Sequence, residues 1–364
     1  MKVAFDPQTF LRQRTGGISR LFTDLIRSFD SDASLGVEAI TPFRWINNTY
    51  AWHDLPGRSL KRPPSWVPRE VLYAPWFARG LRVSPGIDAI HHTYYDRRFL
   101  KPIGPAARVS TIHDMIPEKF AGTEKFTGSH LAKSDYVSHS DLIICVSEAT
   151  RADLDYYLRT PPGKVVVIPN AVQPEFQPGL PRCAKLPSVY MLYVGKREGY
   201  KDFPILPAAM AELQKRSLSC KVVVVGPPFN RREVELFRRY GVTSLFEQHS
   251  LNDAQLRGAY ANCKLLVQTS RYEGFGMTPL EGMASGAPVV VARSSAMPEV
   301  GGDVARYFEP GSAESLAVEL EVVLNDAALR SDLGVRGVER AQQFTTQLMA
   351  ERTAAAYRSA ISTS

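Results

Sequence analysis

A strand–loop–helix–strand pattern constrains the fold of this chain more than any other feature. The segment 271–288, RYEGFGMTPLEGMASGAP, lies between two apolar stretches, 264–268 and 288–291, and each of these predicts a buried strand. Within the segment, Thr278 suits the N-cap of a helix and Pro279 suits its first turn. A helix between two such strands is typical of an α/β fold with a parallel sheet.

Two carboxylates, Glu273 and Glu281, stand eight positions apart around a glycine-containing turn. In one interpretation, Glu281 only completes a capping box with Thr278, and Glu273 is an ordinary loop carboxylate. In the other, the glycine loop brings backbone amides at the positive end of the helix close to a ligand, for which a diphosphate is well suited. The spacing alone leaves both interpretations open.

The segment resembles the E-x7-E motif of retaining, nucleotide-sugar-dependent glycosyltransferases of the family 4 type. That large family has the GT-B fold and includes many mannosyltransferases. The resemblance implies that Glu273 faces the donor sugar and that Glu281 binds the ribose hydroxyls. It also implies that the donor diphosphate lies along the loop and helix start formed by Gly274, Phe275, Gly276, Met277 and Thr278.

The composition indicates a soluble globular protein with room for two domains. The chain has 364 residues, of which 44% are hydrophobic and 22% charged. No apolar run reaches the roughly 18 residues of a membrane span, and charge interrupts the first residues too early for a signal peptide. The four cysteines are scattered and have no metal-ligand spacing. We therefore expect a cytoplasmic protein.

A basic, tryptophan-rich window covers residues 44–82. It holds seven Arg or Lys residues, and all four tryptophans (Trp45, Trp52, Trp66 and Trp76) lie in it; the net charge of the chain is +7. This composition suits an anionic membrane surface or a lipid-diphosphate acceptor, and it predicts a peripheral position on the inner face of the cell membrane. Nucleic acid is the rival partner, but no recognition motif for it occurs, so we expect none. A solvated basic loop remains an alternative.

In the N-terminal half, two motifs lie where a sheet would end. Gly16 and Gly17 stand between a first strand (2–5) and a helical pattern (21–27), which is a geometry for close approach of a ligand. His113 and Asp114 end an apolar strand, where ligands of α/β sheets bind. The family resemblance places the glycines near the donor phosphates and His113 near the donor sugar, with Asp114 positioning His113 or contacting the acceptor. A tight turn and a locally satisfied histidine are the alternatives.

The C-terminal half opens with a strand that ends at Gly195 and is followed by Lys196, Arg197 and Lys201. Cations beside such a turn can neutralise a leaving diphosphate. The family carries a basic residue directly after this glycine and a lysine five or six positions later. Lys196 and Lys201 fit that spacing, but only Arg197 offers a bidentate fork, so the choice between Lys196 and Arg197 stays open.

The alternation of strands and helices predicts two doubly wound, Rossmann-like domains facing across a cleft, as in the GT-B fold. We expect the acceptor-side domain at 1–175 and a proline-rich linker at 176–188. The nucleotide-sugar domain follows at 189–345. In the family the terminal helix, here 346–364, crosses back to the first domain.

The resemblance implies transfer of a sugar from a nucleotide diphosphate to an acceptor hydroxyl with retention, with GDP-mannose favoured as donor. The acceptor would be a glycan, lipid-linked, in bacterial surface polysaccharide synthesis. Two D-x-D triplets, 30–32 and 153–155, are not at strand ends, so we expect no metal and no other cofactor. The alternatives are a non-catalytic nucleotide-binding scaffold, which degraded motifs would favour, and a sugar-nucleotide 2-epimerase, which would need further carboxylates.

Overall fold

The chain forms two compact units, each built around its own parallel sheet. The structure is a computed structural model that describes residues 1–41, 46–55, 86–100, 104–122 and 132–363. Unit 1 comprises Met1–Ala171 and Thr346–Ser364, and unit 2 comprises Val172–Thr345. Among the described residues, no helix combines the length and the apolar character needed to cross a membrane.

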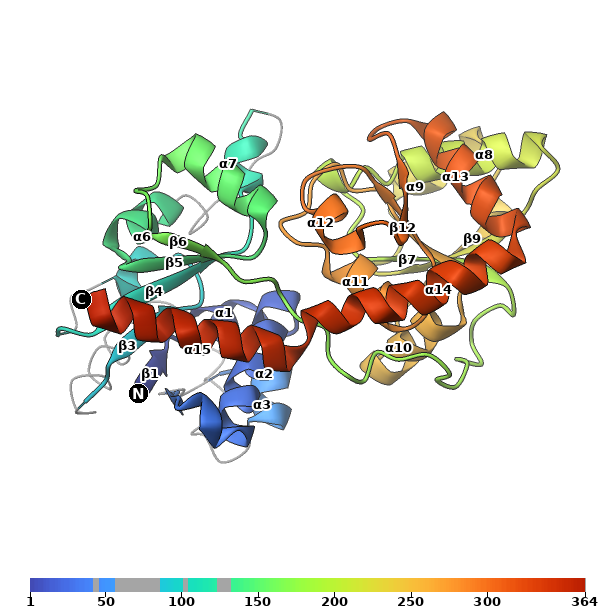
Figure 1. The fold of residues 1–364 in the computed structure, drawn as a ribbon. Coiled ribbons are helices and arrows are strands. Elements are labelled where there is room, and N and C mark those ends of the chain that lie inside the picture. Colours follow the sequence, from blue (N-terminus) through green and yellow to red (C-terminus); the bar gives the residue numbers. More distant parts are fainter. Residues whose placement is uncertain (42–45, 56–85, 101–103, 123–131, 364) are drawn as a thin grey trace. The chain divides into compact units, whose positions relative to one another are not determined.

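The described strands of unit 1 pair in parallel in the order β2-β1-β3-β4-β5-β6 (Figure 1). Their bounds are β1 Lys2–Phe5, β2 Glu38–Ile40, β3 Ala89–His92, β4 Ala107–Ile112, β5 Leu142–Cys145 and β6 Val165–Val167. The helices of this unit are α1 Gln8–Arg12, α2 Gly17–Ser31, α3 Thr49–Asp54, α5 Ile116–Lys119, α6 Lys133–His139, α7 Glu148–Leu158 and α15 Thr346–Thr363.

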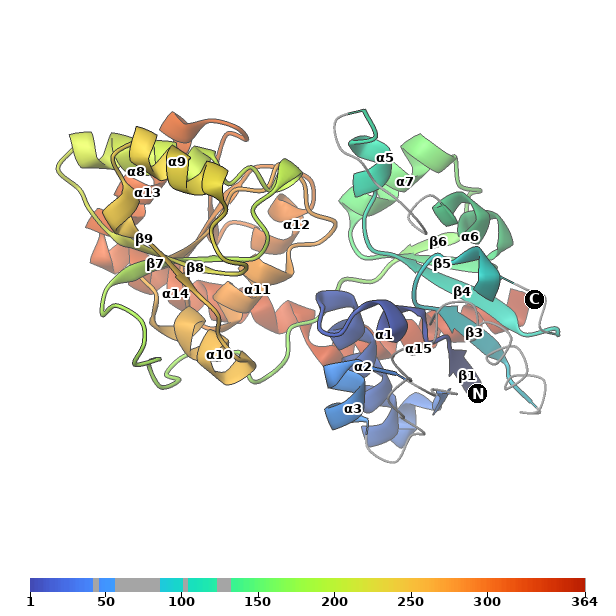
Figure 2. The same ribbon diagram turned by 180° about the vertical axis from the view of Figure 1, so that it is seen from behind.

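The last helix, α15, helps to build the core of unit 1. It lies against α2 and across β3 and β4, as both ribbon views show (Figures 1 and 2). Tyr357 is fully buried there, and its ring contacts those of Phe29 and His91. Burying one large side chain stabilises the fold by about 1.5–3 kcal/mol. Such burial therefore holds α15 in unit 1, although the helix is distant in sequence from the rest of the unit.

Unit 2 carries the second sheet, in the order β12-β11-β10-β7-β8-β9, and all its pairings are parallel. The strands are β7 Tyr190–Val194, β8 Lys221–Val225, β9 Phe246–His249, β10 Leu265–Gln268, β11 Val289–Ala292 and β12 Ala305–Phe308. The helices are α8 Ile205–Lys215, α9 Arg231–Arg239, α10 Asp253–Asn262, α11 Met277–Ala284, α12 Met297–Gly301, α13 Ala313–Asn325 and α14 Ala327–Ala341. Figures 1 and 2 show α8, α9 and α13 on one face of this sheet and α10, α11 and α14 on the other.

The predicted class, α/β with two doubly wound parallel sheets, is confirmed. The segment expected as a linker, 176–188, differs from the prediction because it packs on α10 as part of unit 2. The ring of Phe176 meets that of Tyr260 edge-on at 5.7 Å between centroids, and a Cβ on Gly258 would lie 2.5 Å from the Pro181 carbonyl oxygen. The chain therefore changes unit at Val172, before the prolines.

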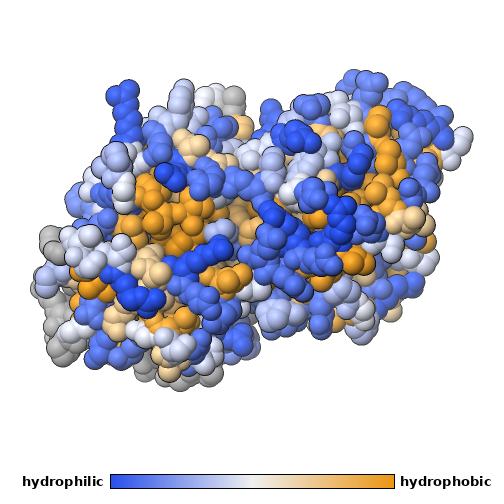
Figure 3. All heavy atoms as spheres, viewed as in Figure 1, coloured by the Kyte–Doolittle hydropathy of each residue, from blue (hydrophilic) through white to orange (hydrophobic). Residues whose placement is uncertain are grey.

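Apolar side chains also reach the surface at several places in the described structure. On the face seen in Figure 3, they gather on unit 1 over β5 and β6, where β6 is an edge strand with half-buried valines. On unit 2 they follow α13, where Val318 and Val322 are exposed one turn apart. Most of the basic window lies outside the described residues, although Trp52 in α3 is exposed.

Candidate functional site

The strand order predicts a ligand crevice in unit 2. β7 lies between β10 and β8, so the chain leaves β7 toward one side of the sheet and returns on the other to form β10. At such a switch point the loops after the two strands turn toward opposite faces, and the carboxyl ends of the strands are left open to a ligand. The loops after β7 (195–202) and after β10 (269–276) are therefore the first candidates for a site.

The turn after β7 approaches the turn after β8 very closely. Gly195 has a φ of 127°, a conformation that favours glycine. A Cβ on Gly226, directly after β8, would lie 2.5 Å from the Gly195 carbonyl oxygen. Only glycine fits at Gly226, because the clash would be with backbone that cannot turn aside. The close approach fixes the backbone at the edge of the crevice.

The loops after β7 and β10 are joined by hydrogen bonds. The Arg271 amide donates to the Tyr200 carbonyl oxygen at 2.8 Å, and Thr269 Oγ1 donates to the Lys201 carbonyl oxygen at 2.7 Å. Lys201 Nζ then donates to Glu273 Oε1 at 2.6 Å. The lysine and the carboxylate predicted to bind the donor therefore lie side by side, although they are 72 positions apart.

Glu273 is held at its backbone and at one of its two carboxylate oxygens. Its amide donates to Ser295 Oγ, and that hydroxyl donates back to the Glu273 carbonyl oxygen. Oε1 accepts from Lys201 and, at 2.6 Å, from Gln268 Nε2. Among the described residues, no group donates to Oε2, and this oxygen is not enclosed. Glu273 thus presents one fixed, accessible acceptor.

The helix after Glu273 begins differently from the prediction. α11 starts at Met277 with Gly276 as its N-cap, so Thr278 lies inside the first turn and is not the cap. Gly276 has a φ of 110°, and a Cβ there would lie 2.3 Å from the end of the Met297 side chain. With this glycine as N-cap, the helix begins two residues earlier than it would with Thr278 as N-cap. Gly274 precedes this turn, and Phe275 is buried against Phe344.

The expected capping box is also absent from α11. Glu281 is buried and accepts a hydrogen bond from Tyr260 Oη at 2.8 Å, which comes from α10. The helix start therefore does not depend on Glu281. One carboxylate oxygen is fixed by a phenol, which leaves this residue oriented for a role other than capping.

Lys196 and Arg197 have different surroundings, although they are neighbours in sequence. Lys196 is exposed, whereas the Arg197 guanidinium is buried between the rings of Phe203 and Phe229. Arg197 donates to both carboxylate oxygens of Glu233, from Nε at 2.5 Å and from Nη2 at 3.1 Å. Its bidentate fork is occupied within the protein, so Lys196 is the more accessible cation for a diphosphate.

In unit 1, the predicted glycine pair lies at the start of α2. Gly16 is the N-cap and Gly17 the first helical residue, and Gln13 Oε1 accepts from the Ser19 amide at 3.0 Å. The short helix α1 lies between β1 and the pair, whereas we expected no helix between the first strand and the glycines. The glycine pair therefore begins a 15-residue helix, and the Ser19 amide in its first turn already donates to Gln13.

His113 follows β4 and is enclosed. The Tyr95 hydroxyl accepts from its amide at 3.0 Å, and its ring meets that of Phe22 edge-on. Burial is the main cause that lowers the pKa of His113 to about 4; the nearby Lys133 acts in the same direction, and Asp114 acts against it. The imidazole is therefore neutral at neutral pH, with an Nε2 that has no hydrogen-bond partner among the described residues.

Asp114 is fixed by a buried lysine. Lys133, only 2% exposed, donates to the Asp114 carbonyl oxygen at 2.7 Å and to Glu118 Oε2 at 2.9 Å. The Asp114 carboxylate pairs with the same lysine at 3.4 Å and accepts from the Ile116 amide. Asp114 therefore helps to shape the turn after β4.

A polar pair that was not predicted from the sequence lies at the switch point of the unit 1 sheet. This point lies between β1 and β3, and there Asp6 Oδ2 accepts from His92 Nδ1 at 2.8 Å. Asp6 is fully buried and also accepts from the Thr93 amide and hydroxyl and from Gln8 Nε2. The pairing of His92 with Asp6 could be found only once β1 and β3 were known to be neighbours.

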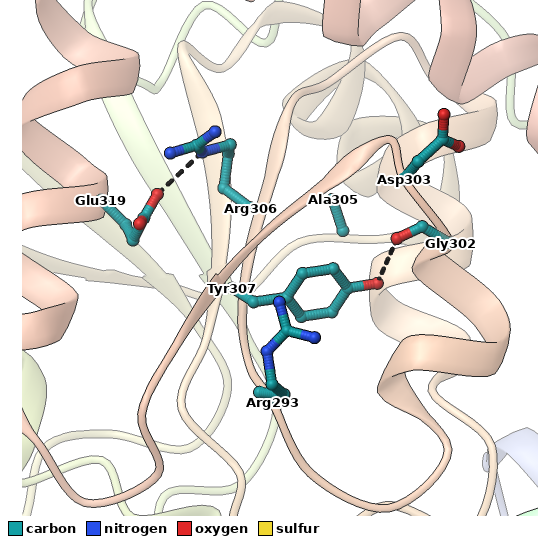
Figure 4. A pocket seen from close by; sticks show the side chains of 7 residues that line it. All are labelled: Arg293, Gly302, Asp303, Ala305, Arg306, Tyr307 and Glu319. Carbon is teal, nitrogen blue, oxygen red and sulfur yellow. Dashed lines mark hydrogen bonds and ion pairs between the residues drawn. The ribbon is translucent and has the colours of Figure 1, made fainter.

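A cavity of about 330 Å³ lies on unit 2 beside β12, away from the loops described above. Figure 4 shows the Arg293 guanidinium over the ring of Tyr307, whose hydroxyl donates to Gly302, and Arg306 paired with Glu319. Arg293 follows β11 and begins the loop that holds Glu273 through Ser295. None of the residues predicted for the site lines this cavity.

Metal ligands are not gathered within the described part of the chain, where no group of three or more His, Cys, Asp or Glu side chains could hold an ion. Of the two D-x-D triplets, 30–32 ends α2 and 153–155 lies within α7.

The fold and two family models identify this chain as a glycosyltransferase with the GT-B fold. A family model described as Glycosyl transferases group 1 matches residues 184–340, and one described as Glycosyltransferase Family 4 matches residues 15–176. Together the two models match most of the chain, and both describe glycosyltransferases.

Curated relatives include two mannosyltransferases of Escherichia coli. The serotype-specific mannosyltransferase WbdA is 28% identical over 260 residues, which are 66% of this chain and 32% of WbdA. O-antigen chain mannosyltransferase B is 24% identical over 288 residues, which cover 74% of this chain and 75% of the relative. The chain therefore spans less than half of WbdA, but most of the second relative.

Solved structures share the fold over nearly the whole chain. Sucrose-phosphate synthase from Thermosynechococcus elongatus has a TM-score of 0.77 at 21% identity and covers 100% of both chains. Anabaena HepE, solved with UDP-glucose, has a TM-score of 0.73 at 17% identity and covers 99% of this chain and 100% of HepE. At these identities the likeness establishes the fold alone.

Proposed function

We propose that this chain transfers a sugar from a nucleoside diphosphate donor to a hydroxyl of a glycan acceptor. The observation that carries the proposal is the arrangement at the switch point of sheet 2, where Lys201, Glu273 and the start of α11 converge. A sugar nucleotide needs an acceptor for sugar hydroxyls next to positive groups for its diphosphate, and this site offers both.

Each residue has a part in this proposal. Glu273 Oε2 accepts a hydrogen bond from a hydroxyl of the donor sugar. Lys201 and Lys196, with the amides that open α11, stabilise the charge that develops on the departing diphosphate. Glu281, held by Tyr260, accepts hydrogen bonds from the ribose hydroxyls. In unit 1, neutral His113 contributes a polar group that carries no charge at neutral pH.

The reaction breaks the bond between the anomeric carbon and the diphosphate oxygen and forms one to the acceptor oxygen. The acceptor proton passes to the leaving diphosphate, so no protein base is required. Attack on the face that the diphosphate leaves retains the anomeric configuration. A covalent intermediate would need a carboxylate on the opposite face of the sugar, and we assign Glu273 to the sugar hydroxyls instead.

We favour GDP-mannose as donor, because relatives named as mannosyltransferases match much of this chain. We further propose a lipid-linked acceptor in bacterial surface polysaccharide synthesis, reached from the cytoplasmic side of the membrane. The net charge of +7 and the exposed Trp52 support a position at an anionic surface.

Calorimetric titration without added metal tests the donor class. GDP, UDP and ADP are titrated into the wild type and into Glu281→Ala, with Glu314→Ala, an exposed residue of α13, as control. We expect tight binding of GDP that weakens about tenfold or more in Glu281→Ala alone, because hydrogen bonds to a charged group are lost. Transfer from GDP-mannose, followed by anomeric analysis of the product, then tests the sugar and retention. A folded protein that binds no nucleotide contradicts the proposal and favours a scaffold.

A further inference from the structure

The last residue of β10 is a buried glutamine in an otherwise apolar strand. Leu265, Leu266 and Val267 are fully buried, as is usual in a central parallel strand, and Gln268 is 4% exposed. A buried polar side chain destabilises the fold unless it is hydrogen-bonded. The contacts of Gln268 therefore indicate why a polar residue stands here.

The amide of Gln268 is aimed at the candidate site. Nε2 donates to Glu273 Oε1 at 2.6 Å and to Ser270 Oγ at 3.1 Å. Because an ionised carboxylate only accepts hydrogen bonds, the amide nitrogen and not its oxygen must face Glu273. The amide oxygen is buried without a hydrogen-bond partner in the described structure. The glutamine thus leaves its own acceptor unsatisfied while it donates to Glu273.

Gln268 and Lys201 hold the same oxygen of Glu273, but they differ in what else they can do. Lys201 is a flexible cation on a turn, and a bound diphosphate would compete with Glu273 for its charge. Gln268 is neutral and sits on a strand, which holds its side chain more rigidly than a loop would. When Lys201 turns to the diphosphate, Gln268 still donates to Oε1.

We propose that Gln268 is a positioning residue: it fixes Glu273 Oε1 so that Oε2 stays directed at a hydroxyl of the donor sugar. This inference rests on the proposed function of the same site. It assigns Gln268 no contact with the reacting atoms. Its effect is on the orientation of Glu273, and therefore on the sugar and not on the nucleotide.

Two substitutions separate positioning from a merely structural role. Gln268→Met keeps the length of the side chain and removes the donor. Gln268→Glu keeps the shape and replaces the donor by a second carboxylate. Gln214→Met, at an exposed position of α8 in the same unit, is the matched control for the first change. Affinities for GDP and GDP-mannose, kcat/KM for transfer and its pH profile are measured for each protein.

For Gln268→Met we expect unchanged affinity for GDP, loss of the added affinity for GDP-mannose, and a fall in kcat/KM of about tenfold or more. For Gln268→Glu, two carboxylates then face each other beside Lys201, and the pair retains a proton to higher pH. While the pair holds that proton, the introduced carboxyl group can donate to Glu273 Oε1 as the amide did. Activity should therefore be partly kept at lower pH and should fall as the last proton leaves, which adds an alkaline limb that the wild-type profile lacks.

A purely structural role predicts another pattern. If both variants unfold at lower temperature but keep the wild-type preference for GDP-mannose over GDP and the wild-type pH profile, the positioning role is wrong and the proposed function stands. If the wild type binds GDP but gains no affinity from the sugar, the positioning role is again overturned. If the wild type binds no sugar nucleotide at all, both inferences fail together.

Discussion

At the scale of single residues, burial sets the protonation state of His113. Burial lowers its pKa to about 4, whereas an exposed histidine titrates near 6.5. The unfolded chain therefore binds a proton that the folded chain does not between these two values. The free energy of unfolding must fall as the pH falls through this window.

We expect His113→Gln to reduce this pH dependence. Between pH 7 and pH 5 the wild type should lose about 2 kcal/mol through His113, in addition to what other groups contribute. The glutamine variant, whose side chain does not titrate, should lose that much less over the same interval. Urea unfolding of both proteins at the two pH values measures the difference. Equal losses would mean that His113 is not held neutral by the fold.

Single residues also show what the sequence could and could not predict of the site. Lys201 and Glu273 were both identified from local motifs, and the structure brings them together. Arg197 could not be distinguished from Lys196, because its role depends on Glu233, which lies 36 positions away on α9. Gln268 carried no motif. Its importance follows from a distance of 2.6 Å that only the folded loop creates.

At the scale of elements, the sequence predicted best where periodicity decides and worst where a contact decides. The strand predicted at 2–5 has the same bounds as β1, and the helical pattern at 21–27 lies within α2. The predicted start of α11 was wrong because a helix can begin after a glycine with positive φ as well as after a residue whose side chain caps it. The strands β9 and β12 were not predicted, because Phe246–His249 and Ala305–Phe308 are short and only partly buried.

The turns after β7 and β8 approach each other so closely that a side chain at Gly226 should destabilise unit 2. Gly226→Ala should destabilise unit 2 by about 1–3 kcal/mol, because the new methyl group meets the Gly195 carbonyl oxygen. Gly17→Ala is the matched control: it opens α2, is exposed, and has nothing within 4 Å of an added Cβ. Its effect should stay within about 0.5 kcal/mol. Urea unfolding measures both, and equal effects would show that the backbone contact is not tight.

At the scale of the whole molecule, the chain crosses between its units twice, and its last helix completes the first unit. The apolar residues of α15 belong to the core of unit 1, together with β1, β3 and α2. Unit 2 has a separate core formed by its own sheet with α8 and α13. A defect on the buried face of α15 should therefore unfold unit 1 and leave unit 2 intact.

Two neighbouring alanines of α15 provide the test. Ala354 is fully buried in the core of unit 1, whereas Ala355 is exposed. Ala354→Asp places an unpaired charge in that core and should destabilise unit 1 by about 3–5 kcal/mol, while Ala355→Asp changes little. Urea unfolding followed by circular dichroism should then show an early transition for unit 1 alone, and GDP, whose proposed site lies in unit 2, should still stabilise the later one. If both transitions move together in Ala354→Asp, the two units fold as one cooperative body, and the division at Val172 and Thr345 does not describe how the chain unfolds.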